Sequence, residues 1–204
     1  IYRVNDKFNY FNPKFGLNYE LNKQNRLYIS YAVSHREPVR NNYEHALNAN
    51  LEKPISERLN DLELGYQFKS NTFTAGANVY YMHYKNQFIL TGEVDALGEP
   101  VTRNFAKSYR LGIELEAAYQ PVDWFRWDFN TTISRNRVSD VPVLLTNKTT
   151  TVLKGEKPLA FSPDVMFNNI FTFNYKGLKA MMINRFVGEQ YMTNTGFKTM
   201  ETKE

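Results

Sequence analysis

The sequence contains no cysteine, which excludes a disulfide framework and any cysteine-based zinc or redox site. No apolar run approaches the roughly 20 residues that a membrane-spanning helix needs, so a helical membrane protein is excluded as well. Lysine and arginine total 25 against 21 acidic residues, without any basic cluster, which argues against a nucleic-acid partner. A signal segment is also missing, and Ile1 opens in the middle of a pattern, so we expect the 204 residues to be a piece of a larger protein.

Aromatic residues, in contrast, are abundant, with 14 tyrosines and 15 phenylalanines, and they alternate with polar residues. Phe15, Leu17, Tyr19 and Leu21, for example, occupy every second position of their segment. A period of two is that of a β-strand with one apolar face. The alternation recurs in eight segments and predicts eight strands with almost no helix: 15–21, 27–34, 61–69, 73–82, 109–119, 125–134, 165–175 and 178–191.

The connections between these segments alternate in length. The short ones are Asn22–Asn25, Ser70–Asn71, Pro121–Trp124 and Lys176–Gly177, and the long ones are 37–56, 91–103, 137–160 and a tail from Met192. In an up-and-down meander every second connection lies at the same end, so one rim is predicted to carry tight turns and the other long loops. Transmembrane β-barrels have this asymmetry.

Most charged residues of the predicted strands lie at the polar positions of the alternation. The apolar positions carry no charge near the middle of any segment, where an arginine or lysine facing lipid would cost ~2–4 kcal/mol. The exceptions, His83, Lys85, Lys107 and Arg135, lie toward the long loops, beyond the expected lipid. The pattern predicts an all-β, antiparallel, up-and-down transmembrane barrel. A soluble β-sandwich, which also has one buried face, stays open as an alternative.

Eight stretches resemble the barrel strands of TonB-dependent outer-membrane receptors, in forms common in Bacteroidetes-type bacteria. In chain order they are Phe11–Leu17 with Tyr28–Ser34, Arg36–Arg40 with Glu57–Tyr66, Asn78–Phe88, Ser108–Glu116, and Val187–Tyr191 with Asn194–Thr195. The resemblance implies a 22-stranded barrel in the outer membrane of a Gram-negative bacterium, of which residues 1–204 supply about eight strands. The N-terminal plug domain and the final strands are expected to lie outside these residues.

The resemblance further implies active import of a scarce nutrient, most often a ferric siderophore or other iron chelate, with haem, cobalamin and oligosaccharides as other cargoes. The implied partners are outer-membrane lipid, the protein's own plug, the TonB energising complex and a small nutrient ligand. Two alternatives remain open from the sequence: a passive porin or adhesin barrel without a plug, and a soluble β-sandwich binding module.

We find no pattern for catalysis, for a metal site or for a bound cofactor. His35, His45 and His83 lack metal-ligand spacing, and no nucleophile motif lies beside them. Glu114 and Glu116 could couple as an acid–base pair, but a charge ladder on the lumen wall of the barrel is the stronger interpretation. The residues predicted to face the lumen and the plug are Arg110, Glu114, Glu116, Arg126 and Asp128.

The connection 37–56 is the candidate ligand-binding loop. It contains Arg40, Tyr43 and His45, with Arg36 at its root, and basic and aromatic side chains suit an anionic iron chelate. Residues 36–38 and 48–51 are also loosely similar to the stretches that flank the haem-binding histidine of haem receptors. We nevertheless expect His45 to be a solvated loop histidine rather than a haem ligand.

Overall fold

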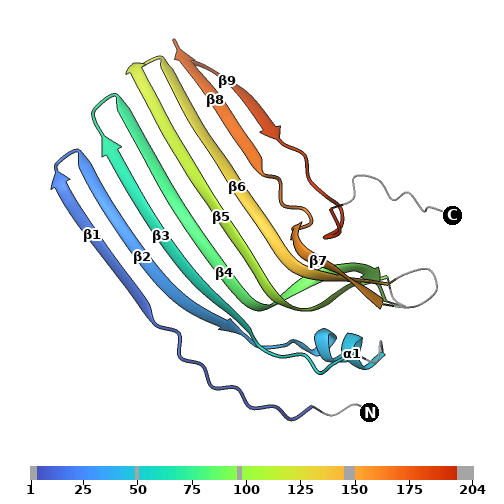
Figure 1. Ribbon diagram of the computed structural model, residues 1–204. Coiled ribbons are helices and arrows are strands. Elements are labelled where there is room, and N and C mark those ends of the chain that lie inside the picture. The colour runs from blue at the N-terminus through green and yellow to red at the C-terminus, as the bar shows by residue number, and fades with distance from the viewer. Residues whose placement is uncertain (1–3, 49–50, 96–97, 145–149, 197–204) are drawn as a thin grey trace.

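The computed structural model describes residues 4–48, 51–95, 98–144 and 150–196, and in these ranges it contains nine strands and one helix (Figure 1). The elements are β1 (Lys14–Asn22), β2 (Asn25–Arg36), α1 (Arg40–Asn48), β3 (Glu57–Lys69), β4 (Phe73–Val94), β5 (Pro100–Val122), β6 (Phe125–Leu144), β7 (Thr150–Pro158), β8 (Val165–Tyr175) and β9 (Leu178–Val187). All eight predicted strands are present, and β7 and α1 are additions that the alternation did not predict.

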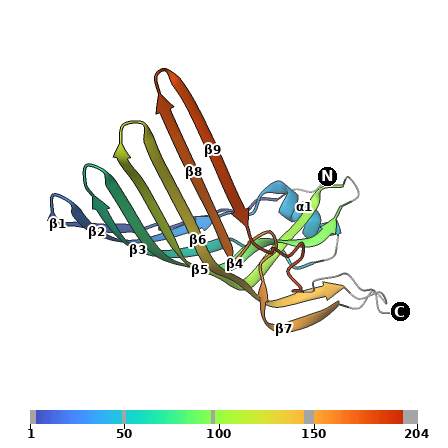
Figure 2. The same cartoon turned by 90° about the horizontal axis from the view of Figure 1, so that it is seen from above.

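The strands form one antiparallel sheet in the order β1-β2-β3-β4-β5-β6-β8-β9, with β7 paired to β6 beside this path. Figures 1 and 2 show a single twisted layer, and no second sheet covers it in the ranges that the structure describes. Large apolar side chains therefore stay uncovered: Leu64 is 54% exposed and Leu111 is 43% exposed. The sandwich interpretation, which requires a second layer over these residues, is wrong.

Strand register separates the side chains into two faces. One row of directly paired residues crosses seven strands as Leu17, Ile29, Leu64, Val79, Ile113, Ile133 and Val165. The neighbouring row, on the opposite face, contains Asn18, Tyr28, Gly65, Asn78, Glu114 and Thr132. Because side chains alternate along every strand, these rows define an apolar face and a polar face of the whole sheet.

The four tight turns lie at one end of the sheet, and α1 and β7 lie at the other (Figure 1). At the first turn the Asn22 side-chain oxygen accepts hydrogen bonds from the backbone N–H groups of Gln24 and Asn25. At the last turn Lys176 and Gly177 both have positive φ, as a two-residue hairpin loop requires. The predicted sorting of short and long connections is therefore present.

The three central strands continue well past the length that crosses a membrane. β4, β5 and β6 have 22, 23 and 20 residues, whereas a tilted transmembrane strand needs about 9–11. Their far halves, together with Leu159 just after β7, form a small hydrophobic core of their own, made of Ile89, Phe105, Val138, Val141 and Leu159. Most of the two predicted loops 91–103 and 137–160 is therefore strand.

The alternating pattern of the sequence did not predict β7, and the pairing of this strand with β6 is irregular. The register shifts between Ser139 and Val141, where Asp140 has a φ of 56° and Gly155, on the other strand, has a φ of 82°. The Asp140 carboxylate accepts the backbone N–H of Gly155 at 3.0 Å, which replaces a ladder hydrogen bond. Gly155 and the terminal Pro158 are typical of a loop, so the sequence predicted a loop in place of this strand.

Helix α1 corrects the expectation that 37–56 is an irregular loop. The cap is made from inside the helix: the Asn42 side-chain oxygen accepts the Val39 N–H at 2.9 Å, and its amide donates to the Thr102 hydroxyl at 2.8 Å. The sequence therefore lacks the usual serine, threonine or aspartate signal at the position before the helix. Within the described ranges no helix is long and apolar enough to span a membrane.

Candidate functional site

The four residues predicted in the candidate ligand-binding loop do not converge on one site. Arg40 has an 87% exposed side chain and pairs with Glu44 one turn along α1, at 2.7 Å. The Arg36 guanidinium lies 5.1 Å above the ring of Phe88 on β4. Both arginines are exposed, one on the helix and the other at the end of β2.

Tyr43 and His45 instead hold α1 in place. The Tyr43 side chain is 5% exposed, and its hydroxyl donates to the Asp6 carboxylate at 2.7 Å. His45 is 7% exposed, with Nε2 lying 3.3 Å from the Asp95 carboxylate between β4 and β5. The expectation of a solvated histidine at position 45 is therefore wrong. In the haem-like stretch 48–51, residues 49 and 50 lie outside the described residues.

The segment before β1 is tied to the loop that follows α1. The Lys53 ammonium lies 2.6 Å from the Asp6 carboxylate, which also accepts the Tyr43 hydroxyl. The hydrogen bonds from Lys53 and then from Tyr43 hold the pKa of the Asp6 carboxyl below its ordinary value. A carboxylate with a lowered pKa stabilises the folded state at neutral pH, and that contribution is lost as the pH falls through the lowered pKa.

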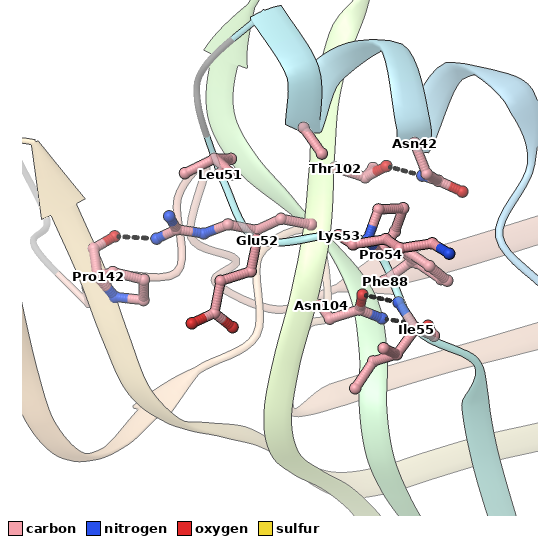
Figure 3. Close-up of a pocket in the computed structure, with 12 residues that line it drawn as sticks. Asn42, Leu51, Glu52, Lys53, Pro54, Ile55, Phe88, Thr102, Asn104 and Pro142 are labelled. Atoms are coloured by element: carbon pink, nitrogen blue, oxygen red, sulfur yellow. Dashed lines mark hydrogen bonds between the residues drawn. The ribbon is translucent and has the colours of Figure 1, made fainter. Parts of the chain in front are cut away.

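Beside α1 lies a cleft of about 340 Å³, shown in Figure 3. It is lined by Asn42, Ala46, Leu51, Glu52, Lys53, Pro54, Ile55, Phe88, Thr102, Arg103, Asn104 and Pro142. One wall, the segment 51–55, is attached to β5 by Asn104: its side-chain oxygen accepts the Ile55 N–H, and its amide donates to the Ile55 carbonyl, both at 2.9 Å. Figure 3 shows the Glu52 and Lys53 side chains pointing in different directions from this segment.

Arg103 supplies the charge on the opposite wall of the cleft. Its guanidinium donates to the Pro142 carbonyl at 3.1 Å and lies 5.5 Å above the ring of Phe105. Partial burial lowers the pKa of this guanidinium, while the charge of Glu93 acts in the opposite direction. Arginine stays protonated under such a shift, so the cleft has a fixed positive group. Sequence reasoning missed this cleft because its residues come from five separate segments, namely α1, residues 51–55, β4, β5 and β6.

The five residues predicted for the lumen side all lie on the polar face, but they do not form a continuous charge ladder in the described part of the chain. Arg126 pairs with Asp128 through two hydrogen bonds from Nε, at 2.8 and 3.0 Å. Arg110 lies 4.8 Å above the ring of Tyr84. The two glutamates contact neutral neighbours: Glu114 approaches the Asn78 amide at 3.4 Å, and Glu116 folds over the backbone of Gly76.

Two tyrosines cover glycines on the same polar face. Tyr28 pairs across the strands with Gly65, and Tyr80 pairs with Gly112. A Cβ atom at either glycine would lie closer than 3.0 Å to the facing tyrosine ring, so these rings can lie flat on the sheet only because the partner lacks a side chain. Among the described residues we find no group of three or more histidine, aspartate or glutamate side chains that could hold a metal ion.

The family model "TonB dependent receptor-like, beta-barrel" matches residues 2–201. The curated proteins contain no match to the sequence. The chain resembles the ferric yersiniabactin uptake receptor FyuA of Yersinia pestis (TM-score 0.64, 18% identity, covering 89% of this chain and 26% of that one). It also resembles the siderophore receptor PirA of Acinetobacter baumannii, with a TM-score of 0.60 and 18% identity, covering 88% of this chain and 30% of that one. A third similar structure is the copper transporter OprC, with a TM-score of 0.66 and 16% identity, covering 88% of this chain and 26% of that one.

At these identities the likeness to solved structures shows a shared fold, and the chain spans under a third of the length of each. The Bacteroidetes origin stays a prediction. The family match over nearly all residues agrees with the single sheet, its two faces and its sorted connections. The chain therefore belongs to the TonB-dependent receptors, which are proteins of the Gram-negative outer membrane, and forms part of their β-barrel domain.

Proposed function

We propose that this chain is a wall segment of an active outer-membrane importer that is energised through TonB and takes up a ferric siderophore or another iron chelate. The observation that carries the proposal is the family match over residues 2–201. The names of two similar structures, a ferric yersiniabactin uptake receptor and a siderophore receptor, support iron chelates as the cargo class. The role is transport, without catalysis.

In this proposal the polar face lines the lumen and meets the protein's own plug domain. Arg110, Glu114, Glu116, Arg126 and Asp128 are the residues we expect to face the plug. Two shallow clefts of about 390 and 470 Å³ lie on this polar face. Their polar lining residues, which include Glu116 and Asp128, could form hydrogen bonds with the surface of the plug. The apolar face is bathed by outer-membrane lipid, because its rows carry no charge at mid-depth.

The end that carries α1 faces the outside of the cell and receives the ligand. Of the four loop residues, we propose Arg36 and Arg40 as direct contacts, because both are exposed, whereas Tyr43 and His45 position the helix. Arg103 in the neighbouring cleft adds a third cation. Guanidinium groups suit the carboxylate, catecholate or hydroxamate oxygens of an iron chelate, since they donate paired hydrogen bonds to planar anions.

The experiment compares uptake of ⁵⁵Fe-labelled chelates by cells with and without the gene, and with and without a working TonB. We expect uptake to need both. A passive porin, the alternative from a different class, would keep transporting without TonB, and an adhesin would show no uptake difference. Uptake that is independent of TonB would therefore overturn the proposal.

A double variant, Arg36→Gln with Arg40→Gln, tests the loop assignment in the intact receptor. Losing a charged hydrogen bond costs roughly 1.5–3 kcal/mol, so we expect ligand affinity to fall about tenfold or more. Lys23→Gln, which removes a charge from the tight turn after β1, is the matched control and should bind normally. Equal affinity of the double variant and the control would contradict the assignment.

A further inference from the structure

Three cations stand side by side on the apolar face, near the end that carries α1. Lys85 on β4 pairs directly with Arg58 on β3 and with Lys107 on β5. All three lie at the alternating positions whose side chains belong to the apolar face, and all three are exposed. His35 on β2 continues the same row, opposite Arg58. We call Arg58, Lys85 and Lys107 the basic row.

This arrangement is unfavourable without an external anion. Directly opposed side chains in an antiparallel sheet have Cβ atoms about 4.5–5.5 Å apart, and like charges at that spacing destabilise the sheet. Within the described residues no carboxylate lies within 4.0 Å of any of the three cations, and Arg58 donates only to the neutral Asn60 side chain, at 3.2 Å.

The neighbouring arginines on β6 differ in this respect. Arg135 pairs with Glu156 at 3.1 Å, and Arg137 pairs with Asp164 at 3.3 Å. The chain therefore neutralises the cations beside the basic row and leaves the row itself without an internal partner among the residues described. An anion from outside the chain would supply the missing charge.

The depth of the row identifies the source of that anion. Lys85 lies twelve residues beyond Phe73, whose ring meets that of Tyr119 edge-on beside the tight turns. We call Phe73 and Tyr119 the aromatic girdle. At about 3.4 Å per residue and a strand tilt of about 40°, the row stands roughly 30 Å above this girdle. The apolar band of an outer-membrane barrel is about 25 Å tall, so the row lies just past its upper edge. The tyrosines of the two rows below, Tyr109 and Tyr81, mark that edge.

We propose that the basic row binds the phosphate groups of a phosphorylated lipid in the outer leaflet, whose acyl chains lie against the apolar face below. The three side chains can converge on one doubly charged phosphate, with Arg58 donating paired hydrogen bonds and the lysines acting as point charges. A lipid, rather than free phosphate, is the occupant because the row adjoins continuous apolar surface. The inference rests on the outward orientation of this end, but not on the identity of the cargo.

The test uses the intact receptor in a neutral detergent and measures lipid binding by native mass spectrometry. The probes are diphosphorylated lipid A, phosphatidylcholine and inorganic phosphate. The row variant combines Arg58→Gln, Lys85→Gln and Lys107→Gln. The matched control combines Lys23→Gln, Lys69→Gln and Lys179→Gln, which removes three charges near the opposite end of the sheet.

We expect the row variant to bind diphosphorylated lipid A roughly a hundredfold more weakly, at about fivefold for each cation, while the control binds like wild type. Phosphatidylcholine binding should not change in either. In detergent without lipid, the row variant should be at least as heat-stable as wild type, since opposed like charges have been removed. A purely structural role for the row would lower that stability instead.

Three results would overturn the proposal: unchanged lipid A binding by the row variant, an equal loss in the control, or full competition by millimolar inorganic phosphate. The last would show a phosphate site that does not need a lipid. Because lipid binding is measured without any iron chelate, these outcomes are separate from the uptake experiment above.

Discussion

An arginine introduced at Ile113 should destabilise the receptor strongly, because this residue lies at the centre of the apolar face. Ile113 pairs with Val79 on β4 and with Ile133 on β6, both of which are large and exposed. It lies six residues from Tyr119 of the aromatic girdle, which at about 3.4 Å per residue and a tilt of about 40° is roughly 15 Å of depth. That is close to the midplane of a 25 Å band.

The expected cost follows from this depth. An arginine on the lipid face at the midplane of a barrel costs about 2–4 kcal/mol. Since about 1.4 kcal/mol is a tenfold change, the equilibrium between folded and unfolded receptor should shift by roughly thirty- to several-hundred-fold. The cost comes from dehydrating the guanidinium, so it should fall sharply for the same substitution nearer either rim.

Thr132→Arg is the matched control for Ile113→Arg. Thr132 lies at nearly the same depth, on the polar face, directly opposite Glu114 on β5. An arginine there has water and a facing carboxylate, so we expect almost no loss of stability. The assay is a denaturant titration of each variant refolded into phosphatidylcholine vesicles, in which the folded fraction is read from the heat-sensitive shift on gels. If both arginines cost the same, or if Thr132→Arg costs more, the assignment of the two faces is refuted.

Two other substitutions test local features of the sheet. Asn104→Ala removes both hydrogen bonds that attach Ile55 to β5, and we expect amide exchange in residues 51–56 to accelerate at least tenfold, as measured by mass spectrometry; unchanged exchange would contradict the attachment. Gly65→Ala forces the Tyr28 ring off the sheet and should cost about 1–3 kcal/mol in the same denaturant titration, whereas Gly16→Ala, with its nearest neighbouring atom 3.9 Å away, should cost little; equal costs would contradict the close approach of ring and glycine.

The sheet could be predicted because period two is a property that each strand carries in its own residues. The alternation through Tyr109, Leu111 and Ile113 needs no knowledge of the neighbouring strands, and the register then brings like positions together. The sorting of the connections was equally local, since glycine, asparagine and proline mark the tight turns in the sequence. These features were enough to identify the fold class and the family resemblance.

The end beyond the membrane could not be predicted in this way, because its structure comes from contacts between distant segments. The cap of α1 depends on Thr102, sixty residues after Asn42, and the burial of His45 depends on Asp95, fifty residues away. Arg103 gave no signal in the sequence, since a single arginine in a predicted loop has no periodic pattern. The candidate cleft therefore became visible only when the strands were assembled.

The small core formed by Leu159 and the far halves of β4, β5 and β6 also affects molecules that approach from outside the cell, in the orientation proposed above. It includes Phe105, Val138 and Leu159, all closely packed, and side chains packed at such density resist displacement. An antibody would therefore meet a conformational epitope assembled from α1, the β4–β5 hairpin and the β6–β7 hairpin. A linear peptide copied from any one of these segments would not reproduce it, and a vaccine antigen would have to present all three together.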